Sequence, residues 1–232
     1  MHIIDFHSHI LPGMDDGSTD MEMSERMLEM YAADGTTTVI ATPHFYAERM
    51  SLEEFLQKRT SSHGRLQAAA EIHGIHLIPG SEVAFFSGMS NAEDLEKLTI
   101  SGTSLLLLEM PFRPWTDRDL LEVERLTVRG LKPVIAHIER FYSCQKRKSV
   151  LEDLYSLPVL IQINAGALLN RRTRRLALKL FQKGKAHLLG SDCHNSNSRP
   201  PNLGAGRKIL ERPGDPYLFI IDQLGEEVLK LK

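Results

Sequence analysis

The segment HIIDFHSH, residues 2–9, begins as an apolar, β-branched run and ends with two histidines. Residues 2–7 have the composition of a buried strand. His7 and His9 lie at its C-terminal end, and in an extended chain residues i and i+2 point to the same side. The segment therefore predicts a strand whose end brings two imidazoles to one ion.

The same kind of unit recurs along the chain. Runs with strand character alternate with helical patterns, such as residues 20–34, where methionines repeat at helical spacing and predict core packing. The predicted strands span residues 2–7, 37–42, 76–82, 104–109, 132–137, 159–164 and 186–192. Alternating strands and helices predict a parallel sheet, and seven such units indicate a closed or nearly closed α/β barrel.

Bulk properties exclude several classes of protein. A chain of 232 residues suits a single barrel domain, so we expect one domain over residues 1–232. A formal net charge of −2, without an aromatic–basic surface pattern, argues against nucleic-acid binding. No apolar run is long enough to insert into a membrane, and two cysteines are too few for a disulfide framework. We expect a cytoplasmic protein.

Metal-capable side chains stand at the ends of six of the seven predicted strands. Because catalytic groups of barrel enzymes lie at the C-terminal ends of strands, we expect them to meet at one rim. They are His7, His9, His44, Glu82, Glu109, His137, Asp192 and His194. The turn MDDG (14–17) adds Asp15 and Asp16, although turn formation alone also explains one aspartate there.

This ligand set predicts a particular chemistry. Imidazoles and carboxylates without thiolates favour manganese, zinc or iron over calcium or a structural zinc. The eight strand-end side chains and one aspartate of the turn make nine candidate ligands, more than one ion needs, so we expect two or three ions, which suits phosphoryl transfer. Arg140 and Arg199 follow His137 and His194 and present guanidinium forks suited to phosphate oxygens. An ordinary surface position is the alternative for both arginines.

The remaining basic residues have simpler interpretations. Five histidines lie at predicted strand starts or in helical stretches, where we expect no metal role: His2, His63, His73, His76 and His187. The cluster RRTRR (171–175) predicts the solvated start of a helix, with docking of an acidic partner as the alternative.

One stretch, GSDCHNSNSR (190–199), has the Cys-x5-Arg spacing of cysteine-dependent tyrosine phosphatases. Those enzymes need a loop whose backbone N–H groups surround the phosphate. Here the five intervening residues lack glycine, and Pro200 and Pro201 follow the arginine. We expect residues 192–194 to be extended with both flanking side chains as ligands, so that Cys193 points the other way. We therefore predict that Cys193 is not a nucleophile.

These motifs resemble the polymerase and histidinol phosphatase (PHP) superfamily, and within it the manganese-dependent protein-tyrosine phosphatases of bacterial capsule and exopolysaccharide synthesis. The resemblance covers about residues 1–205 and is carried by DFHSHILPGMDDG, ATPHF, PGSEV, LLLLEMPF, PVIAHIERF, INAGALL and GSDCHNSNSRPPNL. It implies a distorted (β/α)7 TIM-like barrel, the PHP fold. It also implies a trinuclear centre with the ligands His7, His9, Asp16, His44, Glu82, Glu109, His137, Asp192 and His194, and Arg140 and Arg199 as phosphate-binding catalytic residues. Asp16, rather than Asp15, follows from the resemblance alone.

The resemblance also implies a function. A water activated by three manganese ions, or by iron or zinc, would hydrolyse phosphotyrosine, on the tail of a bacterial tyrosine kinase that controls polysaccharide export. The residues alone predict only metal-assisted phosphoester hydrolysis. One alternative is a phosphomonoesterase acting on a small molecule such as histidinol phosphate, and another is a non-catalytic metal-binding module. The module ranks last because every ligand is present.

Two features depart from the family pattern. Cys193 stands where a small or apolar residue is usual, and the tail over residues 215–232 matches only loosely. No oligomeric state is predicted.

Overall fold

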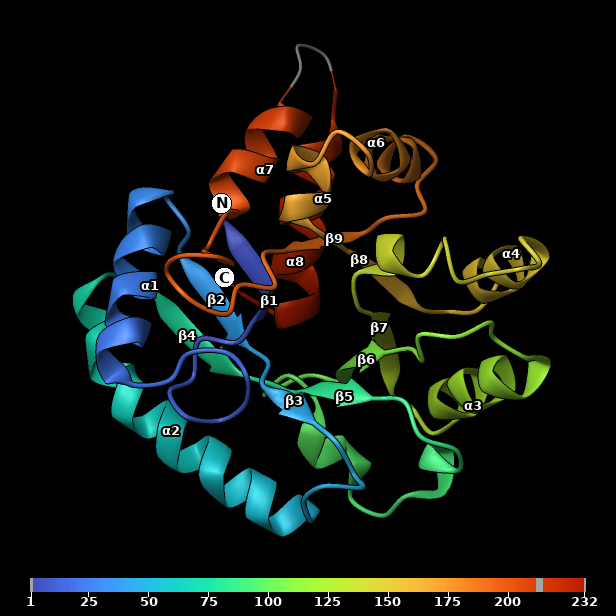
Figure 1. Ribbon diagram of the computed structural model, residues 1–232, viewed down its shortest axis with the longest axis horizontal. Coiled ribbons are helices and arrows are strands. Elements are labelled where there is room, and N and C mark those ends of the chain that lie inside the picture. The colour runs from blue at the N-terminus through green and yellow to red at the C-terminus, as the bar shows by residue number, and fades with distance from the viewer. Residues whose placement is uncertain (1, 212–214, 232) are drawn as a thin grey trace.

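The computed structural model describes residues 2–211 and 215–231, in which parallel strands are surrounded by helices (Figure 1). Two sheets form, with the orders β1-β2-β4 and β3-β5-β6-β7-β8-β9. The strands are β1 (Ile4–Ser8), β2 (Thr38–Ala41), β3 (His44–Phe45), β4 (His76–Pro79), β5 (Glu82–Ala84), β6 (Leu105–Glu109), β7 (Lys132–Ile135), β8 (Leu160–Asn164) and β9 (Leu188–Gly190). The helices are α1 (Met21–Ala33), α2 (Leu52–Ile72), α3 (Asp117–Val128), α4 (Ser149–Tyr155), α5 (Ala165–Leu169), α6 (Arg174–Gln182), α7 (Leu203–Leu210) and α8 (Tyr217–Leu229), with short 3-10 turns η1 (Met89–Asn91), η2 (Leu95–Leu98) and η3 (Ile138–Arg140).

The two sheets together make a distorted barrel with seven strand positions. The predicted strand 37–42 corresponds to β2 and is followed by a further short strand, β3, while the predicted strand 76–82 corresponds to β4 and ends where β5 begins. One break falls at Pro43, which lacks an N–H group for the ladder. The other falls at Gly80, where a Cβ atom would come within 3.2 Å of Ile100. The predicted α/β barrel is confirmed, and its distortion lies at these breaks.

Strands β9 and β1 lie side by side and close the ring. The Asp192 N–H donates to the His7 carbonyl at 2.7 Å, and the His9 N–H donates to the Cys193 carbonyl at 2.9 Å. Ser8 and Cys193 form a parallel bridge between the same segments. The first and last strand positions of the barrel therefore meet beside the two predicted i, i+2 ligand pairs.

Apolar side chains from most strands fill the interior. This cluster comprises Ile4, Phe6, Ile40, Ile78, Ile100, Leu105, Leu107, Val134, Ala136, Leu160, Leu188 and Leu229. Leu229 comes from α8, which lies at the N-terminal end of the barrel, since Glu226 accepts a hydrogen bond from the His2 N–H at 2.6 Å. A bidentate ion pair between Arg207 and Asp222 joins α8 to α7. None of the helices in the described residues has the length and apolar character that a bilayer crossing requires.

Helix α1 follows the loop that contains the MDDG turn. The Asp20 side chain caps it by accepting from the Met23 N–H at 2.9 Å. Met27 and Tyr31 are fully buried, whereas Met23 and Met30 are half-buried, so core packing is confirmed for Met27 and Tyr31 only. Gly35 follows the helix with φ 79°, a conformation that glycine adopts without strain. The loop from residue 10 to residue 20 is thus held between β1 and a well-anchored helix.

Candidate metal centre

The predicted ligands meet at one end of the barrel, where β1, β6, β7 and β9 end and where β3 and β5 begin. Seven of them fall into three groups of nitrogen and oxygen atoms that lie within 4.8 Å of one another. The groups are His9 with Asp16, His44 and His194; His7 with His9 and Glu82; and His44 with Glu82 and Glu109. His9, His44 and Glu82 are each shared between two groups, so the three groups form one continuous cluster.

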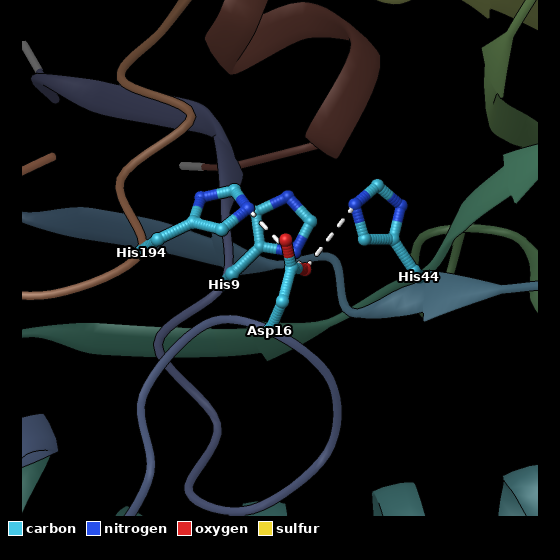
Figure 2. Close-up of side chains that lie close together, drawn as sticks. All are labelled: His9, Asp16, His44 and His194. Atoms are coloured by element: carbon cyan, nitrogen blue, oxygen red, sulfur yellow. Dashed lines mark ion pairs between the residues drawn. The ribbon is translucent and has the colours of Figure 1, made fainter.

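The first group surrounds Asp16 (Figure 2). Its Oδ1 lies 3.5 Å from His194 Nε2 and 3.6 Å from His44 Nε2, and the three side chains come from three different segments. The rings of His9 and His194 have centroids 4.0 Å apart. The Asp16 side chain is 69% exposed, so this group opens to solvent.

The second group is completely buried. His7 Nε2 and His9 Nε2 lie 3.1 Å apart, and Glu82 Oε2 lies 3.1 Å from the first and 3.3 Å from the second. The register of β1 shifts between Asp5 and Ser8, and such an irregularity re-aims side chains. Gly190 of β9 passes close by, and a Cβ atom there would lie 2.6 Å from the His7 Cβ.

The third group lies where β3 and β5 begin and where β6 ends. His44 Nδ1 is 3.0 Å from Glu82 Oε2. His137 borders this group, with its Nε2 2.9 Å from Glu82 Oε1 and 3.4 Å from Glu109 Oε1. Asp192 borders the second group, with Oδ1 3.4 Å from His9 Nε2. All nine predicted ligands are therefore brought together.

The cluster has the properties of a cation site. Several of its buried atoms have neighbours in the described residues but none in hydrogen-bond geometry, namely His44 Nδ1, Glu82 Oε2, His137 Nδ1 and His194 Nε2. Burial would raise the pKa of Glu82, but His7, His137 and His44 hold it well below its usual value, so the carboxylate is charged. Buried nitrogen lone pairs and a carboxylate are costly without a partner. Divalent cations fit this donor set.

Asp15 and Asp16 have different roles in the structure. Asp15 contacts two other candidate-site residues: its Oδ2 lies 2.7 Å from His9 Nδ1 and accepts from the His44 N–H at 2.8 Å. Burial would raise the pKa of Asp15, but His9 and two backbone donors lower it to about 2. A carboxylate at Nδ1 leaves the other ring nitrogen of His9 free to face an ion. Only Asp16 falls in a ligand group.

Strand β8 contributes residues that the sequence did not single out. Gln162 Oε1 accepts from the His137 N–H at 2.7 Å and lies 3.3 Å from His7 Nδ1. Its amide donates to Asn164, whose own amide donates to Asp192 Oδ2 at 2.8 Å. These two amides therefore orient three predicted ligands. The sequence offered one sign of this role: Gln162 and Asn164 are polar residues at positions i and i+2 of the predicted strand 159–164, the one predicted strand without a metal-capable end.

His137 and Asp192 occupy left-handed backbone conformations, with φ of 31° and 54°. The strands before them consequently end earlier than predicted, β7 at Ile135 and β9 at Gly190. The prediction that residues 192–194 are extended is wrong at Asp192. Strain of this kind in residues other than glycine persists where the surroundings enforce it, and it concentrates at functional sites.

Comparison with known proteins identifies the family to which this chain belongs. Residues 3–219 match the model of the family described as "Capsular polysaccharide synthesis, CpsB/CapC".

The chain belongs to the CpsB/CapC family.

Relatives in this family are named as phosphatases. The tyrosine-protein phosphatase YwqE of Bacillus subtilis (strain 168) is 28% identical over 98% of this chain and 92% of its own length. The tyrosine-protein phosphatase CpsB of Streptococcus agalactiae serotype III (strain NEM316) is 26% identical over 90% of both chains. The putative tyrosine-protein phosphatase CapC of Staphylococcus aureus is 29% identical over 85% of this chain and 79% of its own.

Solved structures support the same assignment. A chain from the crystal structures of YwqE from Bacillus subtilis and CpsB from Streptococcus pneumoniae, described as unique metal-dependent tyrosine phosphatases, superposes with a TM-score of 0.83. It is 25% identical, and the match covers 98% of this chain and 94% of that one. A β-aspartyl dipeptidase from Fervidobacterium islandicum AW-1, 15% identical over 99% of this chain and 75% of its own, has a TM-score of 0.56 and shares the fold alone.

In this CpsB/CapC chain both predicted arginines reach the cluster. Arg140 and Arg199 each form an ion pair with the buried Asp192 carboxylate, Arg199 at 2.9 Å. Their side chains remain 38% and 39% exposed. They also line a cavity of about 300 Å³ that begins at Asp192. The two guanidinium groups therefore lie between the candidate ligands and solvent.

Cys193 faces away from the cluster. It is 1% exposed and packs with α1, where the Tyr31 hydroxyl lies 3.0 Å from its Sγ. Burial and the Asp5 carboxylate raise the pKa of the Cys193 thiol to about 12. Neither the position nor the protonation state of this cysteine suits a nucleophile.

The histidines for which no metal role was expected, and the cluster RRTRR, lie outside the three ligand groups. His63 in α2 lies 3.1 Å from the Leu77 carbonyl, and His187 accepts from the Ile161 N–H at 3.0 Å. In the cluster RRTRR, Arg174 donates to the Leu168 and Leu169 carbonyls and so caps the end of α5, while Arg171 and Arg175 are exposed. The predicted helix start is confirmed at Arg174, where α6 begins.

Proposed function

We propose that this protein is a metal-dependent protein-tyrosine phosphatase, which hydrolyses phosphotyrosine with an activated water. One observation carries the proposal: three groups of candidate ligands share residues at one end of a barrel. Membership of a family whose relatives are named tyrosine-protein phosphatases adds the substrate class.

The donor set supports manganese, with iron and zinc as the other ions that imidazoles and carboxylates accommodate. Three groups linked by His9, His44 and Glu82 favour three ions. His7, Glu109, His137, Asp16, Asp192 and His194 complete the proposed ligand set. When bound, such ions supply Lewis acidity toward the phosphoryl oxygens and a nucleophilic water at neutral pH.

The chain itself supplies orientation and fixed charge. Arg140 and Arg199 would hold the phosphoryl oxygens in a bidentate manner while their ion pairs with Asp192 fix their position. Asp15 holds His9 in one tautomer and one orientation. Charges that are in place before the reaction stabilise the transition state without reorganisation.

The physiological substrate that we propose is the phosphorylated tyrosine-rich tail of a bacterial tyrosine kinase, in the cytoplasm. Support comes from the description of the family, which concerns capsular polysaccharide synthesis.

The experiment uses protein purified without chelator, with its metal content measured by elemental analysis. We expect hydrolysis of a phosphotyrosine peptide, loss of that activity with EDTA and recovery with Mn²⁺, and much slower hydrolysis of histidinol phosphate. Full activity after exhaustive chelation, with the loss of metal verified, would refute the metal mechanism. Faster turnover of histidinol phosphate would refute the tyrosine assignment.

A further inference from the structure

A cavity of about 370 Å³ opens beside Asp16 and His44, on the exposed side of the first ligand group. Most of its other walls are apolar: Met14, Phe45, Met50 and Phe55. We call it the Met50 pocket. It is large and concave enough to take a side chain of a ligand, and two candidate metal ligands, Asp16 and His44, are among the residues that line it.

The walls of the Met50 pocket are suited to an aromatic ring. Phe45 and Phe55 are buried and pack edge to face, with ring centroids 5.0 Å apart. The half-buried Tyr46 has its ring 5.2 Å from that of His44, and the guanidinium of the exposed Arg49 lies 4.3 Å from the Tyr46 ring centre. Methionine sulfur and aromatic edges both make favourable contacts with a further ring.

The cavity beside Asp192 has the opposite character. Besides Arg140 and Arg199, amide and hydroxyl side chains such as Asn164, Asn170 and Thr173 line it. These groups suit phosphoryl oxygens or water rather than an apolar ring. The candidate centre therefore lies between an anion-binding side and an apolar side.

We propose that the Met50 pocket binds the aromatic ring of the phosphotyrosine while the phosphoryl group lies between the candidate ligands and the two arginines. The pocket then makes this protein prefer aryl over alkyl phosphomonoesters. This inference rests on the proposed phosphatase function and adds the residues that select the substrate. The competing position is Phe112, an exposed aromatic near the centre: it is 58% exposed and its ring centre lies 6.2 Å from that of His137.

The test compares two non-hydrolysable probes, phenylphosphonate and methylphosphonate, which differ in the ring. Calorimetry on manganese-loaded protein gives both affinities without relying on turnover. We expect phenylphosphonate to bind roughly tenfold more tightly, the scale of one good apolar contact in a specificity pocket. Equal affinities for the wild-type protein would overturn the inference. If the ring preference is present but phosphotyrosine is not hydrolysed, the proposed function has failed instead.

Variants locate the ring. Met50→Glu should abolish the preference for phenylphosphonate, because a carboxylate would enter the apolar wall, whereas Met50→Leu should keep it. Tyr46→Leu, which removes an aromatic wall, provides a second variant should Met50→Glu fail to fold, and it should weaken the preference. Phe112→Ala is the matched control and should retain it. A preference lost in Phe112→Ala and kept in Met50→Glu or Tyr46→Leu would show that the ring lies on Phe112.

Discussion

At the C-terminal ends of the strands, buried imidazoles and carboxylates face one another, whereas at the N-terminal ends the same barrel is filled by leucine, isoleucine and α8. Near the C-terminal rim, His137 and Asp192 hold left-handed conformations and several buried polar atoms lack hydrogen bonds within the described residues. The apolar end includes Leu105, Leu229 and their neighbours in one packed cluster.

This difference shows how one barrel separates stability from function. Apolar burial contributes most of the folding free energy, and it is supplied at the end where no chemistry is proposed. The rim tolerates strain and unpaired polar groups because the rest of the barrel holds it in place. Substitutions at the ligand end should therefore lower activity, and substitutions at the apolar end should lower stability.

Substitution of a candidate ligand should have the largest effect. In His44→Ala or Glu109→Ala the neighbouring Glu82 loses a partner in its ligand group, so we expect kcat/KM to fall by at least about a hundredfold, the scale of losing one key electrostatic element. Steady-state kinetics on a phosphotyrosine peptide, with elemental analysis, measures this. His63→Ala in α2 is the matched control and should keep its activity. A His44→Ala protein with full metal content and normal turnover would show that the site is misplaced.

Removal of an arginine should have an intermediate effect. In Arg140→Ala or Arg199→Ala one charged hydrogen-bonding group is lost beside Asp192, and we expect kcat/KM to fall about tenfold. Metal content should not change. Lysine at either position keeps the charge but not the fork, so it should restore only part of the activity. The exposed Arg175→Ala is the control, and normal kinetics in both site variants would make these arginines surface residues.

Substitution of Cys193 should have a small effect on activity. The thiol is buried against Tyr31 and faces away from the ligands, so Cys193→Ser should retain most of its turnover, and iodoacetamide should inhibit little. The measurement is kcat before and after alkylation, with Cys144→Ser as the control for the less buried thiol. A trapped phosphocysteine, or a Cys193→Ser protein that binds metal but is inactive, would contradict the prediction.

Substitution at the apolar end should leave activity unchanged and lower stability. Leu229→Ala removes a side chain from the interior cluster, and we expect a loss of about 2–3 kcal/mol in the free energy of unfolding. Denaturant titration measures this, and kcat per folded molecule should equal that of the wild-type protein. The exposed Val128→Ala serves as the control. A large loss of turnover in Leu229→Ala, with the fold retained, would show that the two ends are coupled.

The sequence predicted those features that depend on local pattern. The strand-forming runs and the i, i+2 pair His7 and His9 involve neighbouring residues, and the structure has both. The barrel itself also follows from the alternation of elements. Asp16 rather than Asp15 came from family resemblance, and the hydrogen bond from His9 to Asp15 supplies the physical reason.

The features that the sequence did not predict depend on long-range contacts. Gln162 contacts His7, 155 residues away, and Asn164 contacts Asp192, 28 residues away, so no local pattern marks their roles. The left-handed conformation of Asp192 was also missed. Aspartate adopts this conformation only occasionally, so its presence at position 192 does not predict it. The break at Pro43 was visible in the sequence, but its consequence, two sheets instead of one, was not.

That division into two sheets has a mechanical consequence. His7 and His9 belong to or follow β1 of the three-stranded sheet, whereas His44 and Glu82 begin β3 and β5 of the six-stranded sheet. Each ligand group that contains His9 therefore includes residues from both sheets. Cations bound there would cross-link the two sheets, which share few ladder hydrogen bonds. Removal of the cations would therefore abolish activity and also weaken the contact between the two sheets. Amide hydrogen exchange along β3 and β5 would then accelerate before exchange at the apolar end of the barrel does.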